Sequence, residues 1–166
     1  MEFQHRAFLS IGSNLGDKIE NCRRGMDALI AGGDIRIRRR SAMYRTEPVD
    51  FRDQDWFVNC VIRVETGLSP LELLERLQSV QRKAGRPAES MRCGPRVLDL
   101  DILLYDDLIL DDPRLTLPHP RMHRRRFVLK PLCDIDPDTF HPLLGRTAQE
   151  LLAELPEEGQ QVVELE

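Results

Sequence analysis

The amino-acid sequence predicts an α+β fold of the ferredoxin-like type, a βαββαβ chain with a four-stranded antiparallel sheet and additional C-terminal helices. Three observations lead to this prediction. Runs rich in β-branched and aromatic residues alternate, in that order, with segments of helical periodicity. A complete capping signal starts the second predicted helix. In this arrangement both crossover helices cover one face of the sheet, which leaves the other face for a site.

The elements of the first half are expected between residues 6 and 67. Residues 6–12 alternate as a first strand, and residues 34–48 and 56–67 are expected to be the second and third strands. An apolar stripe at helical spacing predicts a helix between the first two strands, and a glycine pair ends it. The stripe consists of Leu15, Ile19, Cys22, Met26 and Leu29, and the glycines are Gly32 and Gly33.

The second predicted helix has the clearest start signal. Ser69 is placed to cap it, with Pro70 at the first helical position and Glu72 three residues after the cap. Its stripe follows as Leu71, Leu74, Leu77 and Gln81, with Gln78 beside them, and Gly85 ends the helix.

The remaining elements follow a proline-containing loop over residues 86–95. Residues 96–107 are expected to be a buried strand and residues 111–120 a loop. A third helix is expected to start within residues 121–132 and to break before Pro131. A second capping box, formed by Thr147 and Glu150, predicts one more helix.

Composition places the chain among ordinary globular proteins. Its 166 residues show no internal repeat, so residues 1–166 are expected to form one domain, with residues 156–166 an acidic tail that either frays or adds an edge strand. The net charge of −4 gives no basic field that would attract nucleic acid. No apolar run reaches membrane-spanning length and no signal peptide precedes the first strand, so no membrane contact is expected.

The cysteines indicate neither a zinc site nor a disulfide framework. They are far apart and form no C-x-x-C pair, so reduced thiols in a cytoplasmic protein are expected. Separately, the protein is expected to be a monomer. The four residues are Cys22, Cys60, Cys93 and Cys133.

Two carboxylates interrupt the apolar strand "RVLDLDILLYDD". Asp99 and Asp101 point to the same face because side chains alternate along a strand, and their Cα atoms are about 6.5–7 Å apart. Such a pair suits a hard cation that keeps its waters, and Mg²⁺ is the usual choice. The competing interpretation is a half-solvated strand with an acidic outer face.

Arginines surround this strand in the sequence, at positions 86, 92, 96, 114, 121, 124, 125 and 126. A metal pair with arginine-bearing loops fits a polyphosphate, although solvated surface charge is the simpler explanation for any single arginine. His119 lies between two prolines, where it either has a structural role or donates to a phosphate. Phe57 and Asn59 share a strand face, so they either belong to the core or bind a flat heterocycle.

Five segments together resemble the 6-hydroxymethyl-7,8-dihydropterin pyrophosphokinase family of folate biosynthesis, over roughly residues 6–137. They are "FLSIGSNLGD", "YRTEP", "FVNCVI", "GPRVLDLDILLYDD" and "LTLPHPRMHRRRFVLKPL". The resemblance implies an ATP-dependent diphosphokinase, in which the hydroxymethyl oxygen of the pterin attacks the β-phosphorus of ATP and AMP is released. It also implies two Mg²⁺ ions held by Asp99 and Asp101, with ATP and the pterin as the small-molecule partners.

The resemblance assigns roles to further positions. The residues implied in catalysis are Arg86, Arg92, Arg96, Asp99 and Asp101. The residues implied at the nucleotide are Gln78, Ile102, Arg114, Thr116, His119 and Arg125. The residues implied at the pterin are Thr46, Pro48, Val49, Phe57, Asn59 and Phe127.

Three positions depart from the family pattern. Cys93 stands where a tryptophan is usual, Ala88 where a basic residue is usual, and Gln81 where an acid is sometimes found. The first two changes are expected to weaken closure of a loop over the nucleotide without touching the metal pair.

Two other functions compete with this interpretation. A polymerase-β-type nucleotidyltransferase also combines a Gly-Ser turn with D-x-D, but there the motifs lie close together, whereas Gly12 and Asp99 are far apart in this chain. A non-enzymatic ferredoxin-like ligand-binding module remains the second alternative.

Overall fold

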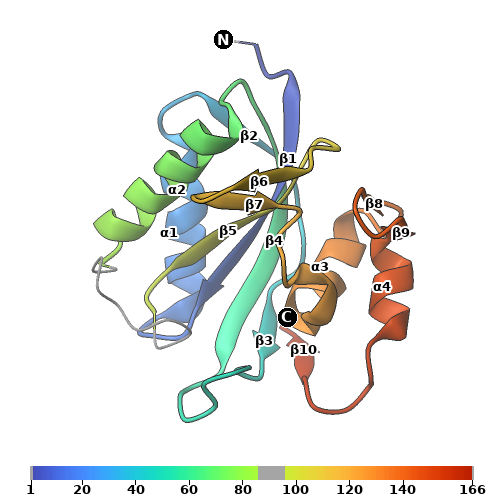
Figure 1. The fold of residues 1–166 in the computed structure, drawn as a ribbon. Coiled ribbons are helices and arrows are strands. Elements are labelled where there is room, and N and C mark those ends of the chain that lie inside the picture. The colour runs from blue at the N-terminus through green and yellow to red at the C-terminus, as the bar shows by residue number, and fades with distance from the viewer. Residues whose placement is uncertain (1, 86–95, 166) are drawn as a thin grey trace.

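A computed structural model describes residues 2–85 and 96–165, and it confirms the predicted α+β fold with an antiparallel sheet (Figure 1). The βαββαβ part consists of β1 (His5–Ser13), α1 (Lys18–Ile30), β2 (Ile35–Arg40), β3 (Tyr44–Thr46), β4 (Phe57–Thr66), α2 (Pro70–Lys83) and β5 (Asp99–Tyr105). The remaining elements are β6 (Leu110–Asp112), β7 (Leu115–Leu117), a 3-10 turn (Met122–Arg124), α3 (Arg126–Ile135), β8 (Phe140–His141), β9 (Arg146–Thr147), α4 (Ala148–Glu154) and β10 (Val162–Glu164).

The main sheet has the strand order β10-β3-β4-β1-β5, and β2 also pairs with β4. The single strand expected over residues 34–48 is therefore wrong, because β2 and β3 pair with different parts of β4. Ser41 separates them: its backbone N–H donates to the Val61 carbonyl at 2.9 Å, and its Oγ accepts from the Val61 N–H at 2.9 Å. The tail supplies the edge strand β10, one of its two expected outcomes.

Other predicted boundaries also change. The loop expected over residues 111–120 contains the β6–β7 hairpin. Helix α3 continues through Pro131 to Ile135 instead of breaking, because its apolar residues, including Leu129 and Leu132, are buried in the core. Leu15 lies before α1 and is exposed.

Both predicted capping boxes are present, at Ser69–Glu72 and Thr147–Glu150. In α2 the buried stripe is shifted to Leu73, Leu77 and Val80. None of the described helices is long and apolar enough to cross a membrane.

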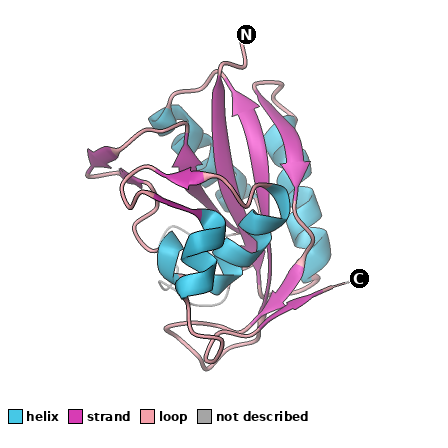
Figure 2. Ribbon diagram, turned by 90° about the vertical axis from the view of Figure 1, so that its right-hand side faces the viewer, coloured by secondary structure: helices cyan, strands magenta, loops and turns pink. Residues whose placement is uncertain are grey.

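The two faces of the sheet carry separate cores. Helices α1 and α2 cover one face, while α3 and α4 lie against part of the other (Figures 1 and 2). In β1, Leu9 and Ile11 belong to the first core and Phe8 to the second, as strand alternation requires. The second face was expected to be free for a site, and α3 and α4 leave only one end of it open.

Gln81 connects α2 to the edge strand β5. It is buried, and its Oε1 accepts a hydrogen bond from the Leu100 backbone N–H at 2.6 Å. Strand β1 is the only sheet neighbour of β5 among the described strands, so this bond satisfies a backbone donor on the outer edge. The donor lies between Asp99 and Asp101, so α2 also fixes the strand that carries both carboxylates.

We expect Gln81→Leu to lower the free energy of unfolding by about 1–3 kcal/mol, because it leaves the buried Leu100 N–H without its acceptor. Leucine keeps a similar side-chain volume, so the loss reports mainly on the hydrogen bond. Gln78→Leu, an exposed position on the same helix, is the matched control and should change the value by less than about 0.5 kcal/mol. Urea denaturation measures both, and equal stabilities would contradict this role of Gln81.

Candidate active site

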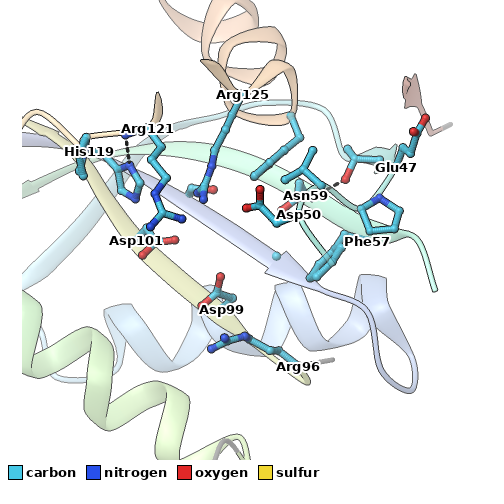
Figure 3. Close-up of a pocket in the computed structure, with 17 residues that line it drawn as sticks. Glu47, Asp50, Phe57, Asn59, Arg96, Asp99, Asp101, His119, Arg121 and Arg125 are labelled. Carbon is cyan, nitrogen blue, oxygen red and sulfur yellow. Dashed lines mark hydrogen bonds between the residues drawn. The ribbon is translucent and has the colours of Figure 1, made fainter. Parts of the chain in front are cut away.

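A cavity of about 270 Å³ opens on the second face of the sheet, beside α3 (Figure 3). Its floor comes from β1, β4 and β5, where Gly12 stands opposite Asn59 on one side and Asp99 on the other. The lining residues are Ser10, Gly12, Thr46, Glu47, Pro48, Val49, Asp50, Phe57, Asn59, Arg96, Asp99, Asp101, His119, Pro120, Arg121, Arg125 and Phe127.

Asp99 and Asp101 are half-buried and both line the cavity. They stand opposite Gly12 and Ser10 of β1, whose small side chains leave room beside the carboxylates. Leu100 points to the other face and is buried in the core under α1 and α2. The two acids of the strand are therefore explained by alternation: one face of β5 is core, and the other faces a polar cavity.

One wall of the cavity combines aromatic and amide side chains. Asn59 is buried, and its Nδ2 donates a hydrogen bond to Thr46 Oγ1 at 2.6 Å. Asn59 Oδ1 lies against Gly12, in the space that a Cβ at residue 12 would occupy. Phe57 from β4 and Phe127 from α3 also line this part. An oriented amide in a cavity that aromatic side chains also line suits a flat ring with hydrogen-bonding edges.

Basic side chains surround the carboxylates. Arg96, Arg121 and Arg125 line the cavity, and Figure 3 shows Arg121 and Arg125 reaching into it from the side of α3. Arg96 is held at its backbone by the buried Asn14, since its N–H donates to Asn14 Oδ1 at 2.7 Å and its carbonyl accepts from the Asn14 N–H at 2.9 Å. Such guanidinium groups match phosphate oxygens.

His119 is a neutral member of this basic wall. Its Nδ1 accepts the Arg121 backbone N–H at 3.1 Å, which leaves Nε2 as the protonated ring nitrogen. Burial, with a smaller effect of the Arg125 charge and against the opposing effect of Asp99, lowers its pKa to about 4. The imidazole therefore stays uncharged near neutral pH and can donate a hydrogen bond from Nε2.

The structure brings most of the predicted site residues into this one cavity. They are Arg96, Asp99, Asp101, His119 and Arg125, together with the whole predicted pterin set of Thr46, Pro48, Val49, Phe57, Asn59 and Phe127. Arg86 and Arg92 lie outside the described residues, as do Ala88 and Cys93.

Four residues expected at the nucleotide do not line the cavity. Gln78 is exposed on α2, and the Ile102 side chain is buried in the opposite core because it alternates with Asp101. Arg114 and Thr116 are exposed on the β6–β7 hairpin, where Arg114 Nε donates to Asp112 Oδ1 at 3.2 Å.

Several lining residues were not assigned from the sequence. The place of Gly12 and Ser10 at the cavity could be predicted only from the register of β1 against its neighbouring strands. Asp50 enters through a turn in which it has φ 60°, an unusual value for a non-glycine residue. Glu47 adjoins the predicted Thr46, and Arg121 stood in the arginine cluster without a role, so neighbouring positions were the available signal.

The carboxylates of Asp99 and Asp101 fit a magnesium ion only if further ligands come from outside the protein. Within residues 2–85 and 96–165, no three His, Cys, Asp or Glu side chains cluster as a complete metal site. Two carboxylates in a polar cavity suit an ion whose remaining ligands are water and phosphate oxygens, as is common for Mg²⁺. The residues present therefore fit a cation that arrives with a polyphosphate.

Comparison with known proteins gives concordant matches. The family model described as 7,8-dihydro-6-hydroxymethylpterin-pyrophosphokinase (HPPK) matches residues 8–137. A 2-amino-4-hydroxy-6-hydroxymethyldihydropteridine pyrophosphokinase of Methylorubrum extorquens is 43% identical, over 96% of this chain and 99% of the relative. The folic acid synthesis protein fol1 of Schizosaccharomyces pombe is 41% identical over 92% of this chain, which spans only 21% of that longer protein.

A solved structure has the same fold. Wild-type HPPK-DHPS of Plasmodium falciparum, crystallised with pteroate, matches with a TM-score of 0.69 over 93% of this chain and 43% of the other, at 15% identity. The family match extends over the strands and the α3 region that build the cavity. The chain belongs to the 7,8-dihydro-6-hydroxymethylpterin-pyrophosphokinase family.

Proposed function

We propose that the protein transfers pyrophosphate from ATP to the hydroxymethyl group of 6-hydroxymethyl-7,8-dihydropterin, as a step of folate synthesis. The observation that carries the proposal is the division of one cavity. Figure 3 shows Asp101 and Arg121 on one side of the cavity and Phe57 and Asn59 on the other. We assign Asp99, Asp101 and the arginines to a polyphosphate end, and Phe57, Phe127 and Asn59 to an end for a flat ring. The names of the bacterial relatives agree with this pair of ligands.

At the pterin end, selectivity comes from the Asn59 amide. Its Nδ2 is engaged by Thr46 Oγ1, so the amide orientation is set before the ligand arrives. Oδ1 then accepts from an N–H of the pterin edge, and the remaining Nδ2 proton donates to a neighbouring acceptor. Phe57 and Phe127 contribute aromatic contact to the ring faces.

At the phosphate end, Asp99 and Asp101 would hold Mg²⁺, for which two ions are expected. When bound, magnesium neutralises phosphate charge and orients the phosphate oxygens. Arg96, Arg121 and Arg125 bind further oxygens, and neutral His119 donates a hydrogen bond without adding charge. The protein's contribution is mainly alignment and electrostatics.

In the proposed reaction the hydroxymethyl oxygen forms a bond to the β-phosphorus of ATP. The bond from that phosphorus to the oxygen bridging the α-phosphate breaks, and AMP leaves with this oxygen. The hydroxyl proton is lost to solvent, and no residue is assigned as general base. A loose phosphoryl-transfer transition state makes little demand for early deprotonation.

The remaining expectations concern the compartment, the oligomeric state and the domain organisation. Among the described residues Cys22, Cys60 and Cys133 are free thiols, which agrees with a reducing compartment such as the cytoplasm. The monomeric state and the single domain over residues 1–166 stay predictions. Neither a nucleotidyltransferase nor a non-enzymatic module is favoured by the family match.

We expect Asp101→Ala to reduce the rate of AMP release about 10²–10³-fold, because a magnesium ligand is worth several kcal/mol to the transition state. A coupled AMP assay with ATP and hydroxymethyldihydropterin measures the loss. Asp111→Ala, at an exposed aspartate on β6, is the control and should retain wild-type turnover. Equal turnover in Asp101→Ala and wild type would refute the magnesium assignment.

We expect Gly12→Ala to raise the Kd of the pterin at least about tenfold, because the new Cβ occupies the position of Asn59 Oδ1. Calorimetric titration with the pterin measures the change, and a circular dichroism spectrum checks that the fold is retained. Mg²⁺-ATP binding should change less, since the displaced amide belongs to the pterin end. Unchanged pterin affinity would exclude Asn59 from recognition of the ring.

We expect the ring of His119 to titrate with a pKa near 4 in the free protein, so that it is neutral throughout pH 6–8. Proton NMR follows the ring signal, with His119→Gln as the assignment control. Because the unfolded chain binds this proton more readily, the stability contribution is present above the unfolded pKa and is lost as the pH falls toward 4. A ring that titrates near its ordinary value would mean that His119 is not buried beside Arg125.

A further inference from the structure

The C-terminal segment, residues 156–165, has no role in the reaction described above. The family model ends at residue 137, and none of the described residues of this segment lines the cavity. Nevertheless, β10 pairs with β3 and contacts α3, and residues at the ends of these two elements form two parts of the cavity wall (Figure 1). Its contacts therefore bear on the shape of the cavity.

The first wall is held through backbone pairing. Val162 of β10 stands opposite Thr46 of β3. The Glu47 N–H donates to the Gln161 carbonyl at 2.9 Å, and the Gln161 N–H donates to Glu47 Oε2 at 3.3 Å. Thr46 and Glu47 both line the cavity, so the segment fixes this wall directly behind its lining residues.

The second wall is held by the side chain of Gln160. Helix α3 begins at Arg126, and its cap residue Arg125 makes no side-chain capping bond. The Arg126 N–H, a first-turn donor with no partner inside the helix, donates instead to Gln160 Oε1 at 2.9 Å. Gln160 Nε2 donates in turn to the Arg124 carbonyl at 3.0 Å. Arg125 and Phe127, on either side of the capped residue, line the cavity.

Two further contacts attach the same segment. Arg126 Nη2 donates to the Pro156 carbonyl at 2.9 Å. The buried Tyr44 hydroxyl donates to Asp134 of α3 at 2.5 Å and lies 3.5 Å from Glu164 Oε1 of β10. Burial, with the neighbouring carboxylates, raises the pKa of Tyr44, so the phenol remains a donor. This hydroxyl connects β3, α3 and β10 at one point.

We propose that residues 156–165, the C-terminal brace, are a positioning element that sets the spacing of the two walls around the pterin. Gln160 contacts one wall and Gln161 the other, and the Cα atoms of adjacent residues are about 3.8 Å apart. The walls therefore cannot move apart without breaking one set of these bonds. The inference rests on the proposed function, since the pterin is the ligand whose fit depends on that spacing.

The test compares two neighbouring glutamines. Gln160→Ala removes both side-chain bonds to the start of α3, whereas Gln161→Ala keeps the backbone bonds to Glu47 and is the matched control. We expect Gln160→Ala to raise the Kd of the pterin about fivefold to tenfold, on the scale of one or two net hydrogen bonds. Gln161→Ala should stay within about twofold of wild type, because only backbone groups of Gln161 make these contacts.

Two further measurements separate positioning from a general loss of structure. Gln160→Glu keeps the acceptor for the Arg126 N–H but loses the donor to Arg124, so its pterin affinity should lie between those of wild type and Gln160→Ala. A purely structural defect would lower the active fraction, and hence kcat, without changing the Kd of the remaining folded protein.

The outcomes are distinguishable. If wild type binds the pterin and Gln160→Ala binds it as tightly as Gln161→Ala does, the brace has no positioning role, and the proposed function stands. If wild type itself binds no pterin in the presence or absence of Mg²⁺-ATP, the proposed function fails, and the brace's role fails with it.

Discussion

The register of β1 against β5 is the constraint on which the candidate site depends. Asp99 and Asp101 face the cavity because they stand opposite Gly12 and Ser10 in an antiparallel ladder. A slip of one residue would turn both carboxylates into the core under α1 and α2. The register does shift between Phe8 and Leu9, but the pairing is regular from Leu9–Ile102 through Ser10–Asp101 to Gly12–Asp99. The part of β5 that carries Asp99 and Asp101 is therefore regular, and Gln81 further fixes its outer edge.

The cavity contains many polar groups, and hydrogen bonds from neighbouring residues hold them in place. Buried polar groups require partners, and here the partners lie beside the site and orient it. Asn14 holds the backbone of Arg96 just before the acidic strand, and Thr46 holds the Asn59 amide. Asn14, which directly follows β1, thus has a structural role beside the cavity. Its contribution to the site is indirect, through the placement of Arg96.

Local signals predicted the parts of the structure that depend on local physics. Capping boxes placed α2 and α4, and alternation placed Asp99 and Asp101 on one face. Features that depend on distant segments were missed or misplaced. The break at Ser41 depends on its bonds to Val61, and the role of Gly12 depends on Asn59 across the sheet. The residues expected at the pterin came from resemblance to a family, which already contains such long-range information.

The start of α3 shows how a missing local signal points to a distant partner. An arginine at the cap position satisfies no first-turn N–H, so the sequence around residues 125–127 leaves the helix start without a local acceptor. A helix end whose flanking residues line a cavity needs that acceptor from elsewhere, and Gln160 provides it. The cavity walls are therefore coupled through a segment beyond the family match. Differences in such segments can alter ligand affinity while every residue that touches the ligand stays the same.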